Sequence, residues 1–186
     1  MYLDPGQFPF TSVLESCWLK IRAELENLHA TNFVPWPERA LYGAGWDVFG
    51  LYAYGQKLEK NCALCPETTQ LVEQIPGLTT AGFSSLAPGT HIAPHVGYTN
   101  AVLRCHLGLI VPDGCSMRVG AETRQWREGK CLIFDDTLDH EVWHRGDRPR
   151  VILLLDFKGP EPAGSVHEQP VPDMVARLVQ KLLKES

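Results

Sequence analysis

Histidines are concentrated in the stretch 91–150 of this sequence. Five of the seven histidines fall there: His91, His95, His106, His140 and His144. Imidazole is the commonest protein ligand for borderline metals, and open iron sites in oxygenases are built from two histidines and a carboxylate on a β-barrel. The sequence therefore points to a metal centre, which requires two of these histidines to converge.

The preferred pair is His95 with His140. His95 belongs to the run HIAPHVGYTN at 91–100, and His140 belongs to the run FDDTLDHEVW at 134–143. A single histidine is more often a hydrogen-bonded structural residue than a metal ligand. The polar and turn-forming residues that surround both imidazoles favour the metal site over that reading.

Two neighbouring histidines are alternative ligands. His91 lies four residues before His95, and His144 lies four residues after His140, so each pair shares a strand face if the strand is regular. Pro94 interrupts the first strand and a turn follows the second, so we rank both alternatives below the chosen pair.

An arginine is expected beside the metal. A hairpin centred on Arg145 would place Arg150 directly opposite His140 on the neighbouring strand, with both side chains on one face. A planar guanidinium can hold a carboxylate through two charge-assisted hydrogen bonds, which suits a cosubstrate with a distal carboxylate. This expectation depends on the register, because a slip of one residue would turn Arg150 away.

A second set of polar side chains comes from Arg104 and His106. They are two residues apart and so point the same way on a strand, where both can donate to carboxylate or keto oxygens. The alternative is an ordinary salt bridge for Arg104 and a core position for His106. Asp135 and Asp136 precede His140, and they either orient a metal-bound group or form an Asx-type turn.

β-Strands must position these residues. Seven runs are rich in aromatic and β-branched residues and are separated by turn signals: 47–54, 81–86, 103–111, 116–119, 130–134, 140–144 and 150–157. Short strands at close, regular spacing favour an antiparallel sandwich or barrel over alternating strand-helix units. We therefore predict a mainly β fold, a jelly roll or cupin-like barrel.

Two helices are expected to flank this barrel. Apolar residues recur at three- and four-residue steps over 11–29, which predicts an amphipathic helix packed on the sheet. The segment 30–45 and the Pro-rich tail 160–172 are expected to be irregular. A short amphipathic helix should follow the tail, with its apolar residues on one side: Val175, Leu178, Val179, Leu182 and Leu183.

The composition restricts the classes of function. The chain has 186 residues, of which 44% are apolar, so it can bury a core, and we expect one domain over 1–186. A net charge of -5 without a dense Lys/Arg run argues against nucleic acid as a partner. The sequence has no run apolar enough for a membrane span and no signal-peptide layout at its start, so we expect a cytoplasmic protein.

The motifs in 84–156 resemble those of the aspartyl/asparaginyl β-hydroxylase family of iron(II)- and 2-oxoglutarate-dependent oxygenases. They occur in one order: PGTH and PHVG within 88–97, LRCHLGL at 103–109, FDD at 134–136, HEVW at 140–143, and Arg150. The number and order of these motifs make the resemblance specific.

This resemblance implies a double-stranded β-helix in which His95 and His140 bind iron(II), with Asp136 supporting the site from behind the ligands. The 2-oxoglutarate contacts that it implies come from Ser84, Arg104, His106 and Arg150. Oxygen is the other co-reactant. The implied substrate is a peptide, an amino acid or a small molecule, hydroxylated at an aspartyl or asparaginyl β-carbon or at a related amino-acid or acyl carbon.

Gly97 leaves the third metal position without a side chain. It stands two residues after His95, where most iron(II) oxygenases have the Asp or Glu of a facial triad. We expect water to fill this position, whereas halogenases of the same superfamily use the vacancy for chloride. Hydroxylation is the preferred interpretation, and a halogenase or a non-catalytic cupin-like binding protein are the alternatives.

Val102 and Lys57 are weaker candidates for substrate contacts. In the animal peptide hydroxylases the position of Val102 is an arginine tied to the substrate carboxylate, so a more apolar pocket is expected here. Lys57 is a candidate at the substrate entrance. Cys62 and Cys65 could form half of a zinc site, a redox pair or a local disulfide, but no second cysteine pair completes a zinc site.

Overall fold

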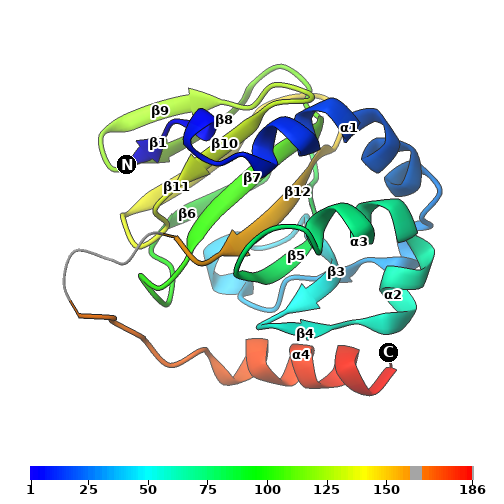
Figure 1. Ribbon diagram of the computed structural model, residues 1–186. Helices are drawn as coiled ribbons and strands as arrows, with labels where there is room; N and C mark the ends of the chain where they lie inside the picture. Colours follow the sequence, from blue (N-terminus) through cyan, green and yellow to red (C-terminus); the bar gives the residue numbers. More distant parts are fainter. Residues whose placement is uncertain (160–164, 186) are drawn as a thin grey trace.

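Two antiparallel sheets form the body of the protein in the computed structural model, which describes residues 1–159 and 165–185 (Figure 1). The larger sheet has the order β1 (Tyr2–Leu3), β10 (Cys131–Phe134), β7 (Leu103–Ile110), β12 (Arg150–Phe157), β5 (Leu78–Leu86), β3 (Trp46–Ala53) and β2 (Val34–Pro35), with β4 (Gln56–Lys57) beside β3. The smaller sheet has the order β6 (His91–His95), β11 (His140–His144), β8 (Cys115–Val119) and β9 (Glu122–Gln125). The predicted mainly β fold is confirmed.

The two sheets pack face to face around a shared apolar core. Alternate residues of a strand point to one face, so each sheet contributes one row of side chains to the interior. This core includes Leu86, Phe134 and Ile152 from the larger sheet and Ile92, Met117 and Val142 from the smaller sheet. The polar residues predicted to do chemistry lie on these same strands.

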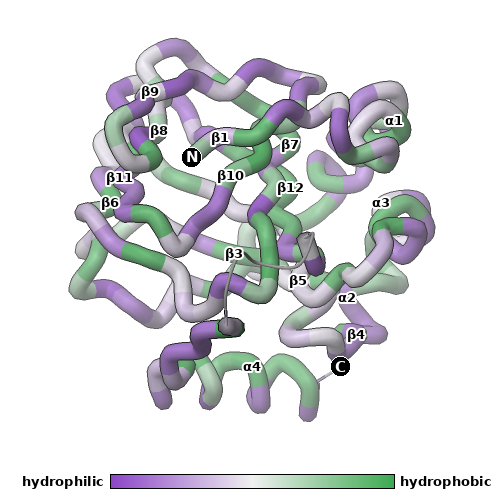
Figure 2. Tube along the Cα trace, turned by 60° about the vertical axis from the view of Figure 1, so that its left-hand side comes forward, coloured by the Kyte–Doolittle hydropathy of each residue, from purple (hydrophilic) through white to green (hydrophobic). Residues whose placement is uncertain are grey.

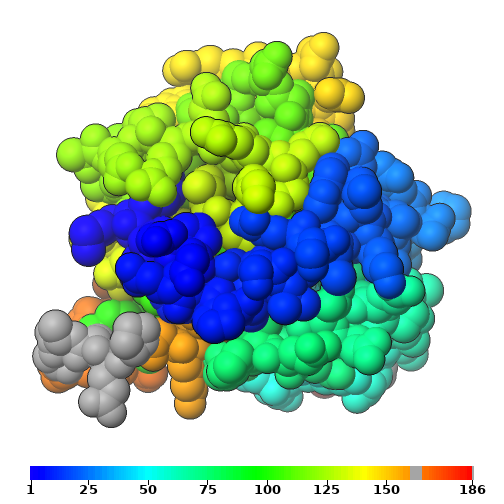
Figure 3. Space-filling model, turned by 45° about the horizontal axis from the view of Figure 1, so that its top comes forward, coloured from blue at the N-terminus to red at the C-terminus, as the bar shows by residue number. Residues whose placement is uncertain are grey.

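Helices cover the other face of the larger sheet. They are α1 (Phe10–Glu26), α2 (Glu59–Leu64) and α3 (Pro66–Val72), and Figure 3 shows α1 and the N-terminal segment (blue) spread over this side next to the α2–α3 segment. Leu14, Ile21 and Leu25 of α1 are buried in a second apolar core. The amphipathic pattern therefore predicted the correct packing face.

The helix boundaries differ in part from the prediction. α1 ends at Glu26, because Asn27 caps the helix and a separate 3-10 turn, η2 (Ala30–Asn32), follows. The sequence did not predict α2 and α3. Each is too short for a helical period to be read from the sequence, and Pro66 interrupts the segment where α3 begins.

The C-terminal helix α4 (Asp173–Glu185) is present as predicted. Hydrophobic and hydrophilic residues alternate along it in Figure 2, and Val175 is its buried residue. The expected irregular tail includes 160–164, which lie outside the described residues. The remainder of the tail makes one isolated antiparallel bridge, between Glu168 and Thr99. No described helix has the length and apolar character needed to cross a membrane.

All seven expected strands are present with slightly shifted ends, and the strands β1, β2, β4, β6 and β9 are additional. β6 runs through Pro94 without interruption. It is the edge strand of the smaller sheet, where a residue without an N–H group is tolerated because one side of the strand needs no ladder hydrogen bonds.

The predicted hairpin between His140 and Arg150 is wrong. β11 pairs with β6 and β8, whereas β12 pairs with β5 and β7 in the other sheet. The residues between them cross from one sheet to the other. At the start of this crossing Arg145 N donates to Gly114 O, which continues the pairing of β11 with β8. Arg150 therefore approaches the metal histidines across the sandwich and not from the adjacent strand.

The buried face of α1 gives a test of the helix-side core. Ile21→Ala is expected to lower the free energy of unfolding by about 2–5 kcal/mol, because it leaves a cavity where a fully buried side chain packed. Leu19→Ala on the same helix is the control, since Leu19 is 63% exposed and should change the stability by less than about 0.5 kcal/mol. Urea denaturation measures both, and equal losses would contradict the packing of α1.

Candidate metal centre

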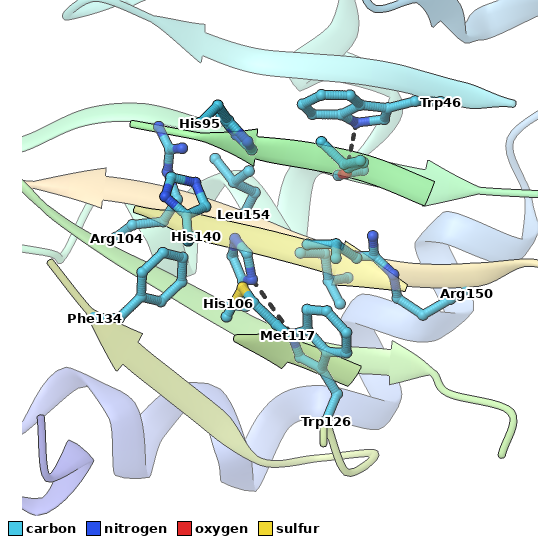
Figure 4. A pocket seen from close by; sticks show the side chains of 14 residues that line it. Trp46, His95, Arg104, His106, Met117, Trp126, Phe134, His140, Arg150 and Leu154 are labelled. Carbon is cyan, nitrogen blue, oxygen red and sulfur yellow. Dashed lines mark hydrogen bonds between the residues drawn. The ribbon is translucent and has the colours of Figure 1, made fainter. Parts of the chain in front are cut away.

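A small cavity between the sheets brings together the polar residues singled out in the sequence (Figure 4). Its lining consists of Trp46, Ser84, Ile92, His95, Arg104, His106, Met117, Trp126, Phe134, His140, Val142, Arg150, Ile152 and Leu154. Ser84, Arg104, His106 and Arg150 come from the larger sheet, and the two metal-ligand candidates come from the smaller one. The cavity thus has a histidine side and an arginine side.

His95 and His140 lie directly opposite each other on paired strands. They are Cα partners in the β6–β11 register, and their ring centroids are 4.1 Å apart. Nδ1 of His95 is 2.8 Å from Ala93 O, and Nδ1 of His140 is 2.9 Å from Leu138 O. A carbonyl only accepts, so Nδ1 carries the proton in both rings and each Nε2 is left with a lone pair for a metal.

Burial keeps both imidazoles in the neutral form that binds metals. It lowers the pKa of His95, and it lowers the pKa of His140 to about 3, with the nearby His95 ring contributing to the latter shift. Within the described residues, no group of three His, Cys, Asp or Glu side chains is arranged to hold a metal ion. The protein therefore offers two nitrogen ligands on one side of a metal.

The carboxylate of Asp136 occupies the space beside Gly97. A Cβ atom added to Gly97 would lie 2.3 Å from Asp136 Oδ2, and Gly97 N donates a hydrogen bond of 2.6 Å to Asp136 O. Any side chain at position 97 would therefore collide with Asp136. The Asp136 carboxylate thus fills the space that a carboxylate side chain at position 97 would need.

Arg104 of β7 contacts two carboxylates, those of Asp136 and of Asp156 on the neighbouring strand β12. Its Nη1 is 3.0 Å from Asp136 Oδ2, and its Nε and Nη2 donate to the two carboxylate oxygens of Asp156 at 2.7 and 3.0 Å. Burial raises the pKa of Asp136, and Arg104 opposes that shift. The salt-bridge alternative for Arg104 thus describes its contacts, although the residue also lines the cavity.

Arg150 lies on the opposite side of the cavity as a buried cation. The residue is 2% exposed, and its Nε and Nη1 atoms have no hydrogen-bond partner among the described residues. Its guanidinium carbon lies 4.7 Å from the centre of the Trp126 ring, and burial lowers its pKa to about 10. A buried charge without a counter-ion is costly, so this arrangement calls for an anion from a bound ligand.

His106 adds a directed hydrogen-bond donor. The Trp126 indole, which can only donate, lies 3.3 Å from His106 Nδ1. Burial, with Arg150 as the next cause, lowers the pKa of His106 well below its ordinary value, so the ring is neutral and Nε2 carries the proton. This Nε2 has no partner among the described residues, and the ring lines the cavity with Arg150 (Figure 4).

Ser84 lies on the strand next to Arg150, and sequence reasoning missed its partner. Trp46 Nε1 donates to Ser84 Oγ at 3.1 Å, which fixes the hydroxyl on the cavity wall. β5 and β12 are paired, so Ser84 faces the cavity from the strand adjacent to that of Arg150. The only signal for Trp46 in the sequence was an aromatic residue immediately before the predicted strand 47–54.

The other candidates lie outside the cavity lining. Lys57 donates to Glu73 at 2.8 Å, and Val102 precedes β7. His91 pairs with Glu141 at 2.7 Å, while His144 contacts Cys115 and the carbonyl of Arg148. Cys62 and Cys65 are buried free thiols.

Comparison with known proteins agrees with the motifs. The family model described as "Aspartyl/Asparaginyl beta-hydroxylase" matches residues 15–160. The chain belongs to the aspartyl/asparaginyl β-hydroxylase family. This family match includes every residue of the cavity lining.

Two curated relatives of this family show how much of each protein is shared. An ornithine lipid ester-linked acyl 2-hydroxylase from Rhizobium tropici is 41% identical over 168 residues, 84% of this chain and 60% of that protein. The human aspartyl/asparaginyl beta-hydroxylase is 37% identical over 167 residues, 85% of this chain and 22% of that protein. The chain therefore spans less than two thirds of the length of either relative.

A solved structure supports the fold independently. A Pseudomonas putida prolyl-4-hydroxylase matches with a TM-score of 0.52 at 15% identity, covering 81% of this chain and 99% of that one. The mainly β architecture is thus the double-stranded β-helix that the resemblance implied.

The contact between Gly97 and Asp136 can be tested by a double-mutant cycle. Gly97→Ala is expected to lower the free energy of unfolding by about 1–3 kcal/mol, because the added methyl group overlaps the Asp136 carboxylate. In an Asp136→Gly background the same change should cost clearly less. Urea denaturation of the four proteins gives the coupling, and strictly additive losses would contradict the steric exchange.

Proposed function

We propose that this protein is an iron(II)- and 2-oxoglutarate-dependent hydroxylase. The observation that carries the proposal is a buried, unpartnered Arg150 in the same cavity as two convergent, neutral histidines. A dicarboxylate that reaches from a metal at the histidines to the guanidinium would satisfy both sides of the cavity.

The ligand set fits iron(II). Two imidazoles with their Nδ1 protons fixed on backbone carbonyls are suited to a borderline divalent metal and leave several of its positions open. Iron bound there would supply the oxygen activation that hydroxylation requires, with 2-oxoglutarate as the co-reductant. Asp136 is not part of the cavity lining, but it lies beside Gly97 and contacts Arg104, a lining residue, and its buried Oδ1 has no hydrogen-bond partner among the described residues.

The arginine side fits 2-oxoglutarate. Arg150 offers two free N–H groups for the distal carboxylate, and Ser84 lies on the next strand as a further hydroxyl group. His106 Nε2–H can donate to an oxygen of the same cosubstrate. These groups hold their positions before any ligand arrives, because Trp126 and Trp46 already fix His106 and Ser84.

The walls between the two sides keep water away from the reacting groups. Phe134 and Met117 are fully buried and Ile152 nearly so, and all three line the cavity. Exclusion of water strengthens the charge interactions of Arg150 and protects reactive species formed during turnover. The apolar core between the sheets therefore also serves the proposed chemistry.

We propose an amino-acid or acyl compound as the substrate. Relatives include a protein named for the acyl group of a lipid and one named for aspartyl and asparaginyl residues. Val102 offers no charge for a substrate carboxylate, which supports an acyl or otherwise less acidic substrate over a free aspartyl side chain.

Arg150→Met tests the cosubstrate site. The change removes the cation but keeps an unbranched side chain, so 2-oxoglutarate affinity is expected to fall by about 30-fold or more while metal binding persists. Calorimetric titration of the Mn(II)-loaded protein measures this under anaerobic conditions. Arg145→Met, which alters an arginine of the exposed turn after β11, is the control and should bind normally. Unchanged affinity in Arg150→Met would remove the main support for the proposal.

His140→Ala tests the metal site. Loss of one of two protein ligands should lower Fe(II) or Co(II) affinity by at least about 100-fold and abolish succinate release. His91→Ala is the control, because His91 pairs with Glu141 outside the cavity. Wild-type metal affinity in His140→Ala would sink the assignment. A chlorinated product at high chloride would favour a halogenase, and 2-oxoglutarate binding without oxygen consumption would favour a binding protein.

A further inference from the structure

Glu38 is a half-buried carboxylate without a cationic partner. It precedes the 3-10 turn η3 (Arg39–Leu41), and it takes part in none of the ion pairs formed by the described residues. Glu15 pairs with Lys130 and Glu24 accepts hydrogen bonds at the start of α3, whereas Asp47 and Asp135, like Glu38, form no ion pair with the described residues. A partly desolvated charge that lacks a counter-ion favours a cation from outside.

Two aromatic residues hold this carboxylate by one oxygen. Trp36 Nε1 donates to Glu38 Oε2 at 3.0 Å, and Tyr98 Oη donates to the same oxygen at 2.5 Å. Burial and the Glu38 charge both raise the pKa of Tyr98, so the phenol stays protonated and remains the donor. Neither bond uses Oε1, which leaves an oriented acceptor for a further hydrogen bond.

This carboxylate lies next to the proposed active site. η3 packs against β6, the strand that carries His95. Trp36 stacks on Trp46 with ring centroids 5.4 Å apart, and Trp46 is the residue that fixes Ser84 on the cavity wall. The stacked rings of Trp36 and Trp46 therefore connect Glu38 to the cavity wall.

The loop that carries Tyr98 is held by the C-terminal part of the chain. Gln169 N donates to Tyr98 O at 2.6 Å, and Glu168 bridges to Thr99. Residues 168 and 169 lie beyond the stretch 15–160 that matches the family model, whereas the histidines and arginines of the cavity lie within it. Glu38, Trp36 and Tyr98 lie within the matched stretch, and only the backbone partners of the Tyr98 loop lie beyond it.

We propose that Glu38, oriented by Trp36 and Tyr98, binds a cationic group of the substrate, of the alkylammonium class. The proposal rests on the proposed hydroxylase function, since it assigns this group to the compound that reacts at the neighbouring metal. An ammonium group would donate to Oε1 and supply the missing positive charge. Such a group occurs in basic amino acids and in the head groups of amino lipids, and both sources offer the same chemistry.

Binding can be measured without turnover. Trp36 donates directly to Glu38, so the chemical shift of its indole N–H should report a ligand at this carboxylate. The probes are hexylammonium, L-lysine, hexanoate and hexanol, titrated into the metal-free protein. Saturable shifts with hexylammonium or L-lysine, and none with hexanoate or hexanol, support the proposal. A stronger response to hexylammonium points to a lipid-like source, and a stronger response to L-lysine points to a free amino acid.

Glu38→Gln is the decisive variant. It keeps an amide oxygen for Trp36 and Tyr98 but removes the charge, so affinity for the responding ammonium probe should fall by about tenfold or more. Glu67→Gln is the matched control, because Glu67 on α3 is exposed and pairs with Lys20 of α1. An unchanged urea denaturation midpoint shows that Glu38→Gln is folded.

Two results would overturn the assignment: no response to either ammonium probe, or equal affinity in wild type and Glu38→Gln. Both are independent of the hydroxylase proposal. Failure of 2-oxoglutarate to bind the wild-type protein would reject that function, whereas an ammonium probe would still report on Glu38.

Discussion

A buried guanidinium without a protein counter-ion is the constraint on which the site depends. Arg150 lies in the middle of an apolar sandwich, and no described residue accepts a hydrogen bond from its Nε or Nη1. Folding therefore retains an unfavourable charge in the interior, at a cost that other contacts must offset. The extended pairing of β12 with β5 and β7 gives the backbone of Arg150 little freedom to move towards solvent. A bound carboxylate would relieve this cost, which supports the proposal that the site binds an anionic cosubstrate.

The metal side follows from strand register. Because His95 and His140 are cross-strand partners, their rings meet without help from a loop. Each ring is oriented by a carbonyl two residues earlier in the chain, so the local backbone sets the tautomer. Asp136 then occupies the volume that a side chain at position 97 would need. The carboxylate beside Gly97 thus belongs to a different segment and is held by Arg104.

The apolar core under the helices and the apolar core between the sheets differ in their relation to the cavity. The core under α1, α2 and α3 is remote from the cavity and mainly stabilises the larger sheet. The core between the sheets contributes residues such as Met117 and Ile152 to the cavity wall, so its packing affects both stability and the exclusion of water. Tyr42 and Trp46 pack against this core between the sheets, and Trp46 stacks on Trp36, which donates to Glu38.

The sequence by itself determined the strand-rich fold, the packing face of α1 and the histidines, arginines and serine of the cavity lining, because strand periodicity and the ordered motifs are local properties. Only the tertiary structure decided how Arg150 reaches the site. The hairpin expected from local spacing gave way to a crossing between sheets, since the partners of β11 and β12 are distant in sequence. Glu38 was invisible in the sequence for the same reason: its meaning comes from Tyr98, 60 residues away in the chain.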